Sequence, residues 1–558
     1  SGSAIVSRSI ARNPVDDRSS TGTSGSPVWR GARRSCEPGA NRSNALFIAV
    51  CDLRTEFGAW MNSSQYIVSV TGVVAVLSGF AALLVTSYGL VGFSDPAKWY
   101  LFARDFGSSF DSVGLAYGFP LLQAAAIAMV GPLYGFLVNV PLLVILAGLV
   151  YVFGRQQVDD LDGSEAIYLS PALAGAGALS FLMVVDWKTL LNLVNPYRDP
   201  LSHLLVLLAC IGFVAWSRRK RDTPLGPVAV GCVLALAVAS RETAVFMLGP
   251  IGLYAIASRD RHPGRLSARN AMMFGGALFL ASVPLLIQNG LVSGNPVMPA
   301  QMAGGFEERH EFVPGIRFEQ LSSTLPAVLH HLANQYGAAG LLVLIGVAVS
   351  IRYRISVALY LSLPAMLLHI GFYGAYARVV GRYLVIVDMF AAPLAGVGIA
   401  WIAGLALRAV DDSRIRNRLT QGAIALAFLP GLVAPVSAMM SVKPRFQLEQ
   451  ARRLRADLIA LLPPGAPVMG DRPFAEILQC FVGDRLAVDH RTFEVSRLDA
   501  QLDRSGVAYV LKRNPVGDDV APRFDAAVLA VFPRALYQLD PFLLYEVRPA
   551  RPSRPSID

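Results

Sequence analysis

Charged residues are scarce in this chain. Only 16% of its 558 residues are Asp, Glu, Lys or Arg, whereas an ordinary soluble domain has about 25%. Hydrophobic residues make up 54%, and the mean hydropathy is +0.48. This composition excludes an ordinary soluble enzyme and, over most of the length, intrinsic disorder. We therefore expect most of the chain to lie in a lipid bilayer.

Several chemical motifs are also missing. The cysteines stand at 36, 51, 210, 232 and 480, and no pair has the spacing of a redox motif or a zinc site. Cys210 and Cys232 fall in apolar runs and are predicted to be small core residues. The chain has no nucleotide-binding glycine motif and no internal repeat of the kind that marks many transporters. We expect no structural disulfide, no metal site among the cysteines and no required cofactor.

Long apolar runs begin at Tyr66. A helical span needs about 20 apolar residues, and a series of runs approaches or reaches that length. Arg241 and Glu242 separate two of the shorter ones and are predicted to form a tight turn at one membrane face. The predicted spans are 66–91, 131–153, 166–185, 201–217, 225–240, 243–257, 271–291, 336–351, 355–375, 383–407 and 420–441.

The basic residues fix the expected orientation. A formal charge of +10 can indicate a nucleic-acid partner, but here the cations stand beside membrane spans, so no nucleic acid is expected. With the amino end inside, the inner loops hold fifteen Lys and Arg residues, and the outer loops hold nine in roughly twice the length. The positive-inside rule thus predicts a multi-pass protein with a cytoplasmic amino terminus. The membrane that we expect is a bacterial cytoplasmic membrane.

Two polar regions flank the spans. Residues 1–60 are rich in Ser, Arg, Gly and Pro, and we expect them to be disordered or foreign to the native protein. Residues 61–441 form the predicted membrane domain. Residues 442–558 are charged and punctuated by proline, with strand-like runs at 467–470, 486–488 and 507–511 between helical patterns at 474–481 and 496–504. The fold class expected is mainly α, with about 11 transmembrane helices and a small C-terminal α/β domain on the outer side.

The residues of the outer loops are unusual for segments that only connect helices. Asp95 stands before a proline at the outer end of the first span, and Tyr100 follows in the same loop. An Asp before a Pro is a good helix start, so Asp95 is also explained as a cap. Later segments have the same character: Ala116-Tyr-Gly-Phe-Pro-Leu-Leu, Asn195-Pro-Tyr-Arg-Asp-Pro-Leu, Ser240-Arg-Glu-Thr-Ala and Arg378-Val-Val-Gly-Arg-Tyr-Leu.

In their order and spacing these segments resemble the GT-C glycosyltransferase superfamily. The resemblance is closest to the branch of polyprenyl-phosphate-sugar-dependent protein mannosyltransferases and lipid A aminoarabinose transferases, and it covers about residues 66–558. It implies an inverting enzyme that moves a sugar from a polyprenyl phosphate to a glycan, lipid or protein acceptor at the outer membrane face. The first loop departs from the pattern, because it has Asp95-Pro where many relatives have two adjacent acids.

The resemblance implies roles that the chemistry supports. The acceptor hydroxyl needs a base, for which Asp95 is the candidate. The departing phosphate needs cations, and the candidates are Arg382 and Arg241, because arginine binds phosphate oxygens bidentately. Arg378 lies one turn before Arg382 and can share its helix face. Tyr383 either binds the donor phosphate or packs.

Further acids are candidates for the acceptor site or its cavity, together with Tyr100. Asp105 can position the acceptor, although a solvated charge also explains it. Asp199 precedes a proline and is explained by a helix cap, with an acceptor or divalent-metal role as the alternative. Asp388 lies inside the tenth span, two turns below Arg382, where an acid is costly unless it faces a cavity or a partner.

Three other functions remain open at this stage. An O-antigen ligase or polymerase would also use outer arginines, but would require neither Asp95 at the first span nor an α/β tail. A transporter would move substrate without transferring sugar, and it fits poorly with the missing repeats and the long outer tail. A non-catalytic scaffold or receptor would not need a lipid-width cavity faced by Asp95.

Overall fold

The fold is described from a computed structural model of the chain. Asp95, Asp105 and Arg378 lie outside the described residues, as do the helical patterns expected at 474–481 and 496–504. The described residues are 64–86, 100, 102–104, 116–131, 135–159, 161, 169–195, 197–218, 224–258, 267–296, 321–375, 381–441, 448–463, 466–470, 486–489, 509–513, 535–539 and 542–546.

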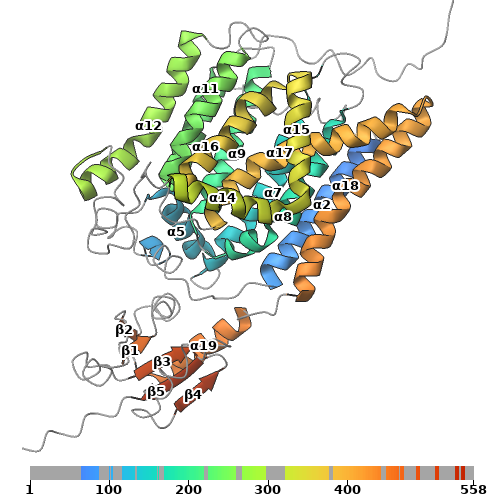
Figure 1. Cartoon of the computed structure of the whole chain (residues 1–558). Coiled ribbons are helices and arrows are strands. Elements are labelled where there is room, and N and C mark those ends of the chain that lie inside the picture. Colours follow the sequence, from blue (N-terminus) through green and yellow to red (C-terminus); the bar gives the residue numbers. More distant parts are fainter. Residues whose placement is uncertain are drawn as a thin grey trace, which may run out of the picture. The chain divides into compact units, whose positions relative to one another are not determined.

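A helix occupies the place of every predicted span (Figure 1). This agreement has a physical basis, because a backbone in lipid must satisfy its hydrogen bonds within one segment. The helices are α2 (Ser64–Thr86), α5 (Gly118–Val130), α7 (Asn139–Gln156), α8 (Pro171–Asn192), α9 (Asp199–Arg218), α10 (Leu225–Ser240), α11 (Leu248–Ala257), α12 (Ala268–Ser293), α14 (Leu321–Tyr336), α15 (Gly340–Tyr353), α16 (Leu363–Gly374), α17 (Gly381–Arg408), α18 (Ser413–Ser441) and α19 (Leu448–Leu461). Short turns join some of them: η2 (Phe136–Val138), η4 (Glu242–Met247), η7 (Gly337–Ala339) and η8 (Ala358–Ser362).

Within the described residues, eight helices are long and apolar enough to cross a membrane, counting 321–353 as one. The spans predicted at 225–240, 243–257 and 355–375 coincide with shorter apolar helices. A further short apolar helix, α5, was not predicted as a span. Eleven crossings therefore remain a prediction, whereas a mainly helical membrane body is established.

Helix α17 is the centre of this body. The most apolar 18-residue stretch of α17 is 83% buried inside the protein, whereas that of α12 is only 11% buried. Small residues bring α17 against its neighbours: a Cβ on Gly396 would lie 2.1 Å from the carbonyl oxygen of Ala174 in α8, and one on Gly398 would lie 2.3 Å from that of Leu342 in α15. Such backbone-to-backbone approach is typical of helices packed in lipid.

The five described strands near the carboxyl end form one mixed sheet. Its order is β2-β1-β3-β5-β4. β1 pairs in parallel with β2 and β3, whereas β5 pairs antiparallel with β3 and β4. The first three lie at or within two residues of the predicted runs, and the last two were not predicted. The strands are β1 (Ala466–Gly470), β2 (Leu486–Asp489), β3 (Tyr509–Arg513), β4 (Ala535–Leu539) and β5 (Phe542–Glu546).

Candidate functional site

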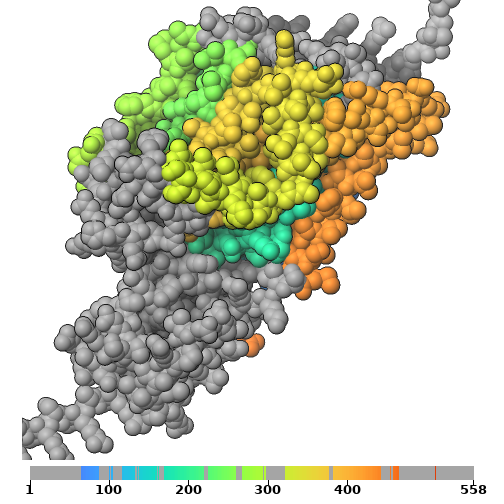
Figure 2. All heavy atoms as spheres, viewed as in Figure 1, coloured from blue at the N-terminus to red at the C-terminus, as the bar shows by residue number. Residues whose placement is uncertain are grey.

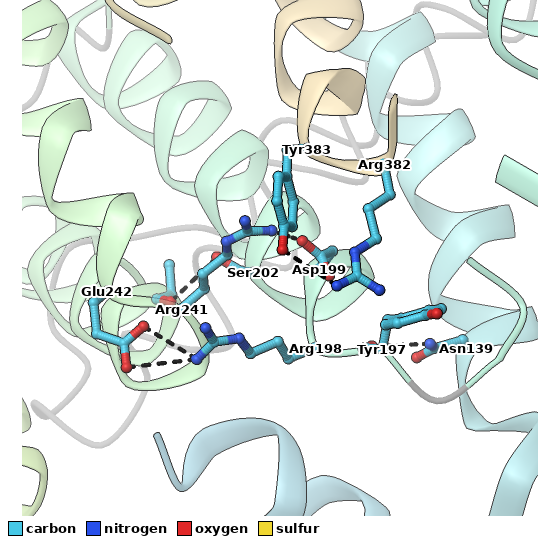
Figure 3. A network of polar contacts seen from close by, with 10 residues as sticks. Asn139, Tyr197, Arg198, Asp199, Ser202, Arg241, Glu242, Arg382 and Tyr383 are labelled. Carbon is cyan, nitrogen blue, oxygen red and sulfur yellow. Dashed lines mark hydrogen bonds and ion pairs between the residues drawn. The ribbon is translucent and has the colours of Figure 1, made fainter. Parts of the chain in front are cut away.

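Three helix ends that are distant in the sequence meet at one polar cluster (Figure 3). Asp199 begins α9, Arg241 follows the last residue of α10, and Arg382 with Tyr383 lies in the first turn of α17. Arg241 and Asp199 are both buried and form an ion pair. The guanidinium carbon of Arg241 also lies 4.8 Å from the centre of the Tyr383 ring. The structure thus brings together three of the four predicted phosphate-binding residues.

Arg382 is held between two tyrosines. Its guanidinium carbon lies 4.4 Å from the centre of the Tyr197 ring and 5.1 Å from that of Tyr383. Its Nη2 donates a hydrogen bond of 3.2 Å to the Tyr383 hydroxyl. Cation–π contacts at these distances orient the planar guanidinium, whose N–H groups match the geometry of phosphate oxygen atoms.

Asn139 organises the segment that carries Tyr197. Its buried side-chain amide lies 3.0 Å from the carbonyl oxygen of Leu193, 2.5 Å from that of Asn195 and 2.9 Å from that of Tyr197. An amide nitrogen has two hydrogens, so the three carbonyls share them. Sequence reasoning missed this residue, although a lone amide inside an apolar run was a signal that could have found it.

A second ion pair and a close helix contact border the cluster. Arg198 Nη1 lies 3.1 Å from Glu242 Oε2, which joins the start of α9 to the turn after α10. The first residue of α5, Gly118, lies against the end of α10, where a Cβ would stand 2.9 Å from the carbonyl oxygen of Ala239. The predicted turn at Arg241 and Glu242 is therefore fixed from two sides.

Asp199 has a partner that the sequence did not reveal. It was predicted to cap a helix, or to act toward an acceptor or a metal, and in the structure it pairs with Arg241. No group of three or more His, Cys, Asp or Glu side chains in the described part of the chain is placed to hold a metal ion.

The other cavity candidates within the described residues are Tyr100 and Asp388. Tyr100 is completely buried in the main hydrophobic core. Asp388 lies six residues after Arg382, about 9 Å along the helix axis, and contacts Gln335 and Tyr336. His369 on α16 is buried, with Nδ1 2.8 Å from the Ala365 carbonyl oxygen.

The cluster is suited to bind an anion. Helix α17 points its first turn at the site, and the unpaired N–H groups and dipole of a helix start favour negative charge. Two guanidinium groups add hydrogen-bond donors in a planar geometry that matches phosphate oxygens. Arg241 is paired with Asp199, and Arg382 adds a second guanidinium group to the cluster.

Comparison with known proteins was made at three levels. No family model and no curated protein sequence matches the chain. Among solved structures, ArnT from Cupriavidus metallidurans bound to undecaprenyl phosphate aligns with a TM-score of 0.57 at 12% identity, over 86% of this chain and 98% of that one. The apo state of the same protein gives 0.56 at 13% identity, over 86% and 97%. The chain therefore shares the fold of these ArnT structures.

A second solved structure is more distant. The oligosaccharyltransferase AglB from Archaeoglobus fulgidus, in complex with an inhibitory peptide and a dolichol-phosphate, aligns with a TM-score of 0.47 at 12% identity, over 80% of this chain and 69% of that one. The resemblance noted from the sequence motifs is confirmed at the level of the fold by the ArnT structures.

Proposed function

We propose that the chain is a membrane glycosyltransferase that moves a sugar from a polyprenyl-phosphate-linked donor to an acceptor at the outer face of a bacterial cytoplasmic membrane. The observation that carries the proposal is the cluster at the start of α17, where Arg382 is oriented by Tyr197 and Tyr383 beside Arg241. The ArnT fold, solved with undecaprenyl phosphate, supports it.

Arg382 would bind the donor phosphate in this reaction. Its guanidinium has two aromatic faces against it, and its donors complement phosphate oxygens. Arg241 would contribute a second positive group from the turn after α10, and Arg378 a third. Tyr383 lies between the guanidinium groups of Arg241 and Arg382, so it would position both and offer its hydroxyl to the phosphate.

The reaction is a single displacement. The acceptor oxygen forms a bond to the anomeric carbon while the bond from that carbon to the phosphate oxygen breaks, which inverts the configuration. The electron pair leaves with the phosphate and is stabilised by the arginines. Asp95 would take the proton of the acceptor hydroxyl, with Tyr100, Asp105, Asp199 and Asp388 as the proposed surroundings of the acceptor or cavity. No cofactor is required by this chemistry.

The proposed arrangement in the membrane follows the charge pattern. The chain would cross eleven times, with the amino terminus in the cytoplasm. Residues 61–441 would form the catalytic membrane domain, and residues 442–558 an α/β domain on the outer side. The acceptor would be a glycan, a lipid or a protein side chain.

Mass spectrometry of lipid co-purified with the full chain tests the proposal directly. A polyprenyl phosphate or its sugar ester is expected in the wild-type preparation and at reduced level in Arg382→Ala. Arg408→Ala is the matched control, because Arg408 lies at the other end of α17 and also donates to a tyrosine hydroxyl, that of Tyr353, at 3.3 Å. Equal lipid in all three preparations would refute the assignment of the site.

Reconstituted vesicles separate transfer from transport. With a radiolabelled polyprenyl-phosphate sugar outside and a membrane extract as the source of acceptor, a transferase releases polyprenyl phosphate and labels the extract. A transporter instead moves the label across the bilayer unchanged, and an O-antigen ligase leaves this donor intact while using a glycan carried on polyprenyl diphosphate. Either of the last two results would refute the proposed transferase function.

A further inference from the structure

A second polar group lies in the membrane body, away from the arginines. Asp186 stands six residues before the end of α8, and Asp388 stands seven residues after the start of α17. At about 1.5 Å per residue, both carboxyl groups lie roughly 9–10 Å from the ends of their helices. They are 1% and 0% exposed. A buried acid at this depth needs a partner.

Gln335 and Tyr336, the last two residues of α14, bind both acids. Gln335 Nε2 donates to Asp186 Oδ1 at 3.2 Å and to Asp388 Oδ2 at 3.0 Å. The Tyr336 hydroxyl donates to Asp388 Oδ1 at 2.6 Å. The remaining oxygen, Asp186 Oδ2, is buried and accepts no hydrogen bond. An unsatisfied buried carboxylate oxygen is costly.

The charges around the two acids do not compensate them. Among the described residues, the side chains bonded to them are those of Gln335 and Tyr336 at the end of α14, and neither acid forms an ion pair there. None of these is a cation. Two ionised carboxylates would therefore place two negative charges in one dry site. Stable carboxyl pairs avoid this arrangement by holding a proton or a cation.

We infer that Asp186 and Asp388 share one proton, and that the protonated pair fastens the end of α14 against α8 and α17. The shared proton forms an O–H···O hydrogen bond between the carboxyl groups and satisfies Asp186 Oδ2. The pair then carries a single negative charge, to which Gln335 and Tyr336 donate. When the proton passes to water, the two carboxylates repel each other and the hydrogen bonds to α14 no longer hold both helices together.

Helix α14, which the carboxyl pair holds in place, lies next to the arginine cluster. Gly337 follows Tyr336 with φ of +50°, in the left-handed region that glycine adopts without strain. Figure 1 shows that α14 and α15 run in different directions on either side of it. In Figure 2 the yellow-green atoms of α14 lie on the surface beside the teal atoms of α8. The imidazole of His331 on α14 lies against Gly381, the residue before Arg382. The pair thus controls a surface helix that borders the arginine cluster.

Within the described residues, the other titratable groups on the packed elements have contacts of their own. Lys188 on α8 lies over the Trp187 ring, 5.5 Å from its centre. His331 approaches Gly381, and His330 bonds Asn334 on its own helix. His369 on α16 faces the Ala365 carbonyl. Because His331 lies on α14 against Gly381, the test includes a His331→Gln variant.

Hydrogen exchange of the segment 321–336 tests the inference in the full chain embedded in lipid nanodiscs. After correction for intrinsic rates, raising the pH from about 6 to about 9 should increase exchange in the wild type by roughly tenfold, as expected for loss of a hydrogen bond to a charged group. Asp186→Asn should stay protected at both pH values, because the Asn amide replaces the shared proton as donor. His331→Gln should behave as the wild type. A wild type without the increase, or an Asp186→Asn variant with the same increase, would overturn the inference.

Infrared spectroscopy detects the proton itself. A carbonyl band of a protonated carboxyl group is expected at neutral pH in the wild type and in Asp412→Asn, a control at an exposed acid that begins α18. The band should vanish in Asp186→Asn and in Asp388→Asn. Persistence of the band in both would contradict a shared proton.

Replacing sodium and potassium with choline tests the alternative that a metal cation lies between the two carboxylates. Protection of α14 that depends on sodium or potassium would also overturn the inference.

Discussion

Replacing Arg382 with alanine should weaken binding of undecaprenyl phosphate by roughly 10- to 150-fold. The range follows from the loss of a hydrogen bond between charged groups, about 1.5–3 kcal/mol, at about 1.4 kcal/mol per factor of ten. The side chain also makes cation–π contacts with two tyrosines, at 4.4 Å and 5.1 Å. These contacts pre-orient the guanidinium, so the loss is expected within this range and not below it.

Conservative variants separate charge from geometry. Arg382→Lys keeps the charge but lacks the planar fork and the stacking, so it should recover only part of the affinity. Tyr197→Leu removes one aromatic face and should weaken binding about 2- to 5-fold, which corresponds to a cation–π contact of about 0.5–1 kcal/mol. Tyr197→Phe keeps the ring and should bind as the wild type does.

Binding is measured by titrating undecaprenyl phosphate into the purified chain in nanodiscs and following a fluorescence or thermal-shift signal, with Arg408→Ala as control. Arg382→Ala should lose affinity, whereas Arg408→Ala should not. Equal affinity in both variants, or full recovery by Arg382→Lys, would refute a bidentate phosphate contact at Arg382.

Three further predictions concern other parts of the chain. Asp95→Asn should lower single-turnover sugar transfer by about 10²–10⁴-fold while donor binding survives, whereas a residue that only caps a helix would make the change almost silent, because Asn caps as well as Asp. A cysteine introduced at Asp471 should react with a membrane-impermeant label in intact cells, and labelling only after lysis would reject the outer location of the C-terminal region. Asn139→Ala should reduce the free energy of unfolding by about 1–3 kcal/mol, because three buried carbonyl groups lose their donor; an unchanged melting curve would show that these contacts contribute nothing measurable.

The helices were predictable because the bilayer imposes a strong constraint on sequence. Each apolar run became a helix, and only the boundaries moved. Within the run predicted at 131–153, helix α7 begins only at Asn139. The start of that run is occupied by Gly131, which adopts φ of +85° and ends α5. The run predicted at 336–351 is preceded by α14, which escaped prediction as a separate element because it is amphipathic and not fully apolar.

Contacts between distant segments were less predictable. Arg241, Arg382 and Tyr383 were named from the sequence, and the structure brings them together. The ion pair of Arg241 with Asp199 depends on the register between α9 and α10, which hydropathy does not encode. The β4–β5 hairpin was missed for a similar reason, since short strands next to turns carry little pattern of their own.

The close packing around α17 has a consequence for the route of a lipid tail. Where Gly396 meets α8 and Gly398 meets α15, backbone atoms already touch, and no acyl or prenyl chain fits between these helices. A long isoprenoid whose headgroup reaches Arg382 would therefore be kept out of these two interfaces, whereas a helix with a largely exposed apolar side leaves room for it. Helix α12, with its exposed Met272, Phe279 and Ile287, offers such a side. The ordered centre would stay unchanged while the carrier enters and leaves sideways from the bilayer.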